Sequence, residues 1–140
     1  MVVMEAETTP NGYVRQPVTV GDHLRKARID RSLLQKDVAK LLDVNSCSIY
    51  NWENNRGDPE IRFVPAIIKF LGYNPRPYPS CTIDRLEWFR WSHGLSLERL
   101  GVEMTRDPEQ LSDWLTGRHK PFRKSLAMID TFLGKKLNPD

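Results

Sequence analysis

The sequence has little of what secreted, membrane-spanning or metal-binding proteins need. Its 140 residues include two cysteines, Cys47 and Cys81, which form no Cys-x-x-Cys pair, and three histidines without metal-ligand spacing. No run of 18 apolar residues is present, so a membrane-spanning helix is not expected. The N-terminus lacks the basic-then-apolar pattern of a secretion signal. We therefore expect a cytoplasmic protein without a metal or other cofactor.

Patterns typical of catalysis are also missing. No glycine-rich phosphate loop, Ser-His-Asp or Cys-His arrangement, or carboxylate pair stands out, so the sequence does not predict an enzyme. The composition, 39% hydrophobic and 28% charged, is that of a soluble globular protein. A net charge of +3 permits nucleic-acid binding but does not demonstrate it.

What the sequence does contain is an internal repeat. Shifted by 62 residues, the chain aligns with itself without a gap, and 11 of the 51 pairs from 22/84 to 72/134 are identical. Trp52 aligns with Trp114, and both copies end in Phe-Leu-Gly. Prolines at 75, 77 and 79 predict a semi-rigid linker between the copies. We expect a flexible arm at 1–17, a domain at 18–73, a linker at 74–79, a second domain at 80–136 and a tail at 137–140.

The first copy has the periodicity and the end signals of short helices. Thr19, followed three residues later by Asp22, predicts an N-cap with an acidic partner. Asn45 is a second N-cap, and Gly72 is a helix stop. The expected helices lie near residues 20–31, from Gln35 to about residue 42, from Ser46 to about Asn54, and from about residue 63 to Leu71. Since no strand pattern occurs, the predicted class is all-α.

The stretch 33–56 and the proline that follows it resemble the lambda-repressor/Cro type of helix-turn-helix, the XRE family. The positions shared with that pattern are Gln35, Ala39, Leu42, Val44, Ile49, Trp52, Glu53 and Pro59. The chain departs at Asn55, where the family usually has glycine, but asparagine also tolerates a left-handed backbone. The resemblance is strong over 19–72 and weak over 82–134. It implies two tandem lambda-repressor-like domains of four to five short helices each.

The resemblance also implies where DNA would be contacted. The helix at 46–54 would enter the major groove with its N-terminal end. The expected base-reading residues are Ser46, Cys47, Tyr50 and Asn51. The expected phosphate contacts are Gln35, Asn54, Arg56 and Arg62. Arg28 and Glu53 are expected to pair inside the domain, as they commonly do in the family.

The second copy differs from the first where DNA would bind. Leu97 and Leu115 replace Gln35 and Glu53, and three carboxylates, at 107, 109 and 113, replace neutral side chains. Four cations follow, which are either auxiliary phosphate contacts or a solvated loop: Arg118, Lys120, Arg123 and Lys124. Trp88 takes the place of Lys26 and is expected to be exposed, marking a contact between copies or chains.

The favoured function is sequence-specific binding of double-stranded operator DNA by a bacterial or phage transcriptional regulator, acting as a repressor. A second interpretation is an antitoxin or adaptor whose second domain binds a partner protein. The family often forms homodimers that reach two half-sites, but one chain with two copies could instead span adjacent sites. No membrane partner is expected.

Overall fold

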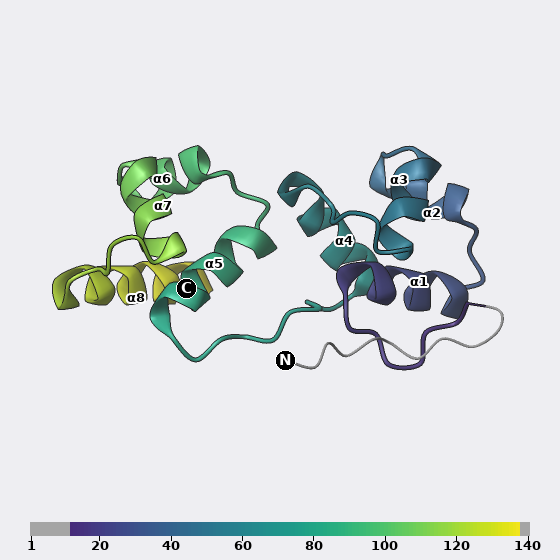
Figure 1. Ribbon diagram of the computed structural model, residues 1–140, viewed down its shortest axis with the longest axis horizontal. Helices are drawn as coiled ribbons and strands as arrows, with labels where there is room; N and C mark the ends of the chain where they lie inside the picture. The colour runs from purple at the N-terminus through teal and green to yellow at the C-terminus, as the bar shows by residue number, and fades with distance from the viewer. Residues whose placement is uncertain (1–11, 138–140) are drawn as a thin grey trace. The chain divides into compact units, whose positions relative to one another are not determined.

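The protein is described by a computed structural model that covers residues 12–137, in which the regular secondary structure is helical and no strand is present (Figure 1). The predicted all-α class is confirmed. The contacts divide the chain into two compact units, Met1–Pro75 and Arg76–Asp140, here called unit 1 and unit 2. Most of the arm expected at 1–17 and of the tail at 137–140 lies outside the described residues, although Val14 is buried.

Two findings about residues 12–137 bear on the expected absences. None of their helices combines the length and apolarity needed to cross a membrane. Nor do these residues group three His, Cys, Asp or Glu side chains as a metal ion would require.

From residue 12 onward, unit 1 forms four α-helices and one short 3-10 helix. They are α1 (Val20–Asp30), α2 (Gln35–Leu42), α3 (Ser46–Glu53), η1 (Ile61–Phe63) and α4 (Val64–Leu71). Each expected helix is confirmed to within about one residue at either end. Gly72 ends α4 with φ of +85°, the left-handed conformation that favours glycine.

The predicted helix caps are also confirmed. Thr19 Oγ1 accepts a hydrogen bond from the Asp22 amide at 3.0 Å, and the Asp22 carboxylate accepts in return from the Thr19 amide at 3.1 Å. Burial raises the pKa of Asp22, but hydrogen bonds from the Thr19 and Val18 amides and from Asn55 outweigh it and leave the pKa below the usual value of an aspartate. Asn45 Oδ1 caps α3 by accepting from the Ser48 amide at 2.9 Å.

The core of unit 1 draws side chains from α1, α2, α3 and α4, including Leu24, Val38, Ile49 and Ile67. A close backbone contact joins the start of α1 to the end of α3. A Cβ atom at Gly21 would lie 1.8 Å from the Trp52 carbonyl oxygen, so only glycine fits there. This contact fixes the position of α3 relative to α1.

Unit 2 contains α5 (Thr82–Ser92), α6 (Leu97–Met104), α7 (Pro108–Thr116) and α8 (Arg123–Leu137). The first residues of α5, α6 and α7 each lie 62 positions after those of α1, α2 and α3. The core of unit 2 is again drawn from all four helices and includes Leu86, Leu100, Leu111, Trp114 and Ile129.

The expectation that Trp88 is exposed is wrong. Trp88 is half-buried because its Nε1 donates to the Arg76 carbonyl at 2.9 Å and its ring meets that of Tyr78, with centroids 5.0 Å apart. Arg85 Nε also donates to the Pro79 carbonyl at 3.0 Å. The proline-rich residues 76–79 therefore pack along α5, and they cover part of the tryptophan within its own unit.

Candidate nucleic-acid interface

Helix α3 turns one face to the core of unit 1 and the other to solvent. Ile49 and Trp52 are buried, as their spacing predicted. The four residues expected to read bases are all exposed: Ser46, Cys47, Tyr50 and Asn51. The exposed face carries no formal charge from these side chains, so it does not repel phosphate. The sequence therefore placed these residues on the correct side of the helix, and their contact with bases stays a prediction.

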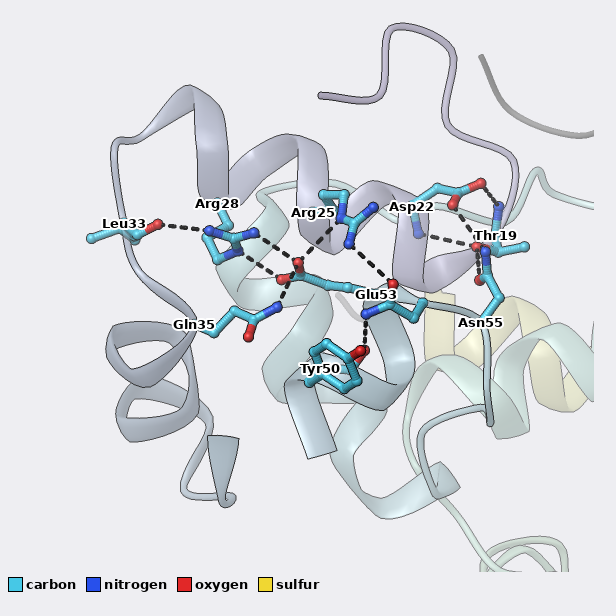
Figure 2. Close-up of polar contacts among 10 residues, drawn as sticks. Thr19, Asp22, Arg25, Arg28, Leu33, Gln35, Tyr50, Glu53 and Asn55 are labelled. Atoms are coloured by element: carbon cyan, nitrogen blue, oxygen red, sulfur yellow. Dashed lines mark hydrogen bonds and ion pairs between the residues drawn. The ribbon is translucent and has the colours of Figure 1, made fainter. Parts of the chain in front are cut away.

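The opposite side of α3 is held by a buried carboxylate (Figure 2). The side chain of Glu53 is fully buried. It accepts from Arg28 Nε at 2.7 Å and from the Arg28 terminal nitrogen at 2.8 Å, which confirms the expected pair. Gln35, on α2, donates to the same carboxylate at 3.3 Å. Gln35 thus braces α3, while its expected phosphate contact remains a prediction.

Arg25 is a further residue of this network that the sequence analysis missed. Its Nε lies 3.4 Å from Glu53 Oε1, and its terminal nitrogen donates to Asn54 Oδ1 at 3.4 Å. Arg25 precedes Arg28 by three positions, a spacing that places two side chains on one face of a helix. The sequence could have indicated Arg25 through this spacing, because one carboxylate can accept hydrogen bonds from two arginines on the same helix face.

The residues after α3 connect it to the start of α1. Asn55 has φ of +56°, so the left-handed backbone expected there is confirmed. Its side-chain Oδ1 accepts from Thr19 Oγ1 at 2.7 Å, and its side-chain Nδ2 donates to Asp22 Oδ1 at 3.3 Å. Glycine, the usual family residue, could form neither bond. Asn54 Nδ2 donates to the Tyr50 carbonyl at 2.8 Å, so one proton of this expected phosphate donor is already used.

The two arginines expected at the DNA backbone lie at the surface beyond α3. The Arg56 guanidinium lies over the Tyr50 ring, 5.4 Å from its centroid. Arg62 pairs with Glu60 at 2.9 Å, and both side chains are about 70% exposed. An exposed pair of this kind contributes little to stability, so Arg62 can exchange Glu60 for a phosphate at small cost.

Unit 2 arranges the matching positions differently. Arg90, which aligns with Arg28, bonds to Glu87 on its own helix at 2.8 and 2.9 Å. The position of Glu53 is occupied by Leu115, which offers no carboxylate. On α7, Asp113 lies 3.6 Å from Arg118. The other three cations of the expected auxiliary set are exposed: Lys120, Arg123 and Lys124.

Comparison with known proteins identifies the class of unit 1. Residues 21–78 match a family model described as a helix-turn-helix domain. Searches of curated proteins and of solved structures find no match. This part of the chain is therefore a helix-turn-helix domain of the lambda-repressor/Cro type, as the sequence predicted. Such a domain indicates DNA binding and a role in transcription.

Proposed function

We propose that the chain binds double-stranded DNA sequence-specifically through α3 and represses transcription by occupying an operator. One observation carries the proposal: α3 presents an exposed, polar, uncharged face while its opposite side is fixed by the buried Glu53 carboxylate. A major groove admits one helix, and the discrimination of bases requires that the helix be held in place. The network around Glu53 supplies that rigidity from both α1 and α2.

Asn51 is the strongest candidate for a base contact. A carboxamide can donate to N7 and accept from N6 of adenine, a pairing that discriminates by about 1–3 kcal/mol. Ser46 and Cys47 lie in the first turn, the end of the helix that enters the groove. Gln35, Asn54, Arg56 and Arg62 are proposed to contact phosphates, which set the register of the protein on the duplex.

Unit 2 is proposed to be a degenerate copy of the same domain. The 62-residue spacing of its first three helices supports this, as do the aligned buried residues Trp52 and Trp114. Its α7 carries Glu109 and Asp113 in place of Cys47 and Asn51. These carboxylates would meet phosphates of the same sign, so α7 is not proposed to enter a groove.

The test starts with in vitro selection of bound sequences from random double-stranded DNA, using the full chain. Affinity for the selected site is then measured at several salt concentrations. Asn51→Ala is expected to lose about 1–3 kcal/mol on the selected site and almost nothing on unrelated DNA. Arg56→Ala should weaken binding to both and lower the salt slope by about one.

Gln110→Ala is the matched control, because it removes an exposed carboxamide from α7 in unit 2. It is expected to bind the selected site like the unmodified chain. If Gln110→Ala weakened that binding while Asn51→Ala left it intact, unit 2 would be the reader and the proposal would be wrong.

A further inference from the structure

Unit 2 has a hollow of about 640 Å³ between α7 and the residues that lead into α8. It is here called the α7 groove. One side is formed by Asp107, Glu109 and Asp113, and the other by residues 119–122, with Trp114 also lining it. A space of this size accommodates several side chains of a bound segment.

Carboxylates outnumber cations among the residues that line the α7 groove. Three of them line it against one lysine, Lys120, and one histidine. Asp107 Oδ1 is held in place by the Glu109 amide at 2.8 Å. Asp113 lies 3.6 Å from Arg118 and 3.8 Å from His119, and Arg123 and Lys124 follow at the start of α8. Because these carboxylates are fixed in position before binding, they favour a cationic side chain beside α7.

The α7 groove also carries an unusually exposed aromatic side chain. Phe122 is 84% exposed, the largest value among the large hydrophobic residues described as exposed. The matching residue of unit 1 is the charged Glu60. A phenylalanine at the edge of a hollow that already contains Trp114 provides an apolar contact for an incoming side chain. The change from charge to aromatic and the added carboxylates occur on the same face.

We propose that the α7 groove binds a lysine- or arginine-rich segment of a partner protein that also carries one large apolar side chain. The carboxylates attract and orient the cations, and Phe122 packs against the apolar side chain. This function is separate from the DNA contact proposed for α3, because it uses a different unit of the chain.

The test uses a phage-displayed library of random dodecapeptides, selected against the full chain. The expected outcome is enrichment of peptides that have a positive net charge and at least one leucine, tryptophan or phenylalanine. The best peptide is then synthesised and titrated into the isotope-labelled chain. Amide signals of residues 107–122 should shift. A selection that enriches neutral or acidic peptides, or yields none that shift these signals, overturns the proposal.

Variants locate the contact. Glu109→Gln and Phe122→Ser, both at exposed positions, should each weaken peptide binding at least tenfold. The controls are Glu98→Gln and Val102→Ser, which remove an exposed carboxylate and an exposed apolar side chain from α6, and they should bind normally. Equal losses in variants and controls would refute the assignment.

Titration with the selected DNA site provides the competing outcome. If residues 107–122 shift with DNA and not with the peptide, unit 2 contacts nucleic acid and the inference fails. Binding of DNA by α3 is measured in the same Glu109→Gln variant and should not change. The two proposals can therefore fail independently.

Discussion

Arg28 of unit 1 and the aligned Arg90 of unit 2 bond to carboxylates at different positions, and two substitutions can introduce the arrangement of unit 2 into unit 1. In unit 1, Arg28 bonds to Glu53 on α3 and also donates to the Leu33 carbonyl at 3.1 Å. In unit 2, Arg90 makes the same kind of carbonyl bond but takes its carboxylate from Glu87 on its own helix. The proposed double variant gives unit 1 the residues that unit 2 has at these two positions. Glu53→Leu introduces the counterpart of Leu115, and Arg25→Glu introduces the counterpart of Glu87.

The magnitude follows from burial. The Glu53 side chain is fully buried, whereas those of Arg28 and Arg25 are 15% and 20% exposed. Removing one partner of a buried ion pair costs about 3–5 kcal/mol. Because both arginines can reach some water, we expect Glu53→Leu to cost about 3 kcal/mol. Arg25→Glu alone should also destabilise unit 1, since it sets a second carboxylate beside Glu53.

The double variant should recover at least about 1 kcal/mol relative to the sum of the single changes, because residue 25 then pairs with Arg28 within α1. Amide hydrogen exchange at Ile49 and Trp52 in the full chain measures the unfolding free energy of unit 1. Lys26→Glu is the control, since Lys26 pairs with Asp30 and lies over the Tyr13 ring without touching the Glu53 network, and it should cost less than about 1 kcal/mol. Strict additivity of the two changes, or a Glu53→Leu variant as stable as the unmodified chain, would refute this account.

Two further predictions concern the contact between α1 and α3. Gly21→Ala should destabilise unit 1 by at least about 2 kcal/mol, because its methyl group would overlap the Trp52 carbonyl. The control is Gly57→Ala, where a Cβ atom would have nothing within 4 Å, and it should leave the free energy of unfolding unchanged or slightly raised. Chemical unfolding of the two variants measures the difference. The pKa of Asp22 is lowered on folding, so its contribution is complete above about pH 4 and is lost as the pH falls through the folded-state value. Asp22→Asn should therefore be less stable than the unmodified chain at neutral pH and closer to it at about pH 2; an unchanged difference would contradict the role given to this carboxylate.

Most of the fold of unit 1 could be predicted because its helix ends are encoded locally. The boundary that sequence reasoning missed is the start of α8. The cations at 118–124 form one cluster in the sequence, yet α8 already begins within it, at Arg123. Unit 1 has only a 3-10 turn at the matching residues, because Pro65 lacks the amide that an α-helix beginning at Ile61 would need. Ala127 stands at that position in unit 2, so the helix can start earlier.

The candidate site was predicted less completely than the fold. Helical spacing was enough to assign the exposed face of α3, because the face depends on neighbours within one helix. The tie from Asn55 to Thr19 spans 36 positions and depends on the approach of two helices, which no local pattern encodes. The α7 groove was missed for a similar reason, since it exists only because residues 119–122 pack beside α7.

Two features differ together between the units: the hydrogen bonds that Glu53 forms with Arg28 and Gln35, here called the polar tether, and the charge on the exposed face of α3 or α7. In unit 1, Glu53 connects the C-terminal end of α3 to α1 and α2, and the N-terminal turn of α3 is left uncovered. A helix that must discriminate bases needs such fixed geometry, because a displacement of about 1 Å breaks a bidentate hydrogen bond. In unit 2, leucines occupy both the Gln35 and Glu53 positions, and the exposed face is acidic. A helix that meets a flexible peptide can tolerate apolar packing alone, since the peptide adjusts to it. Unit 2 has a complete core without such a polar network, so the network is not needed for folding, and its absence agrees with the different ligand proposed for the α7 groove.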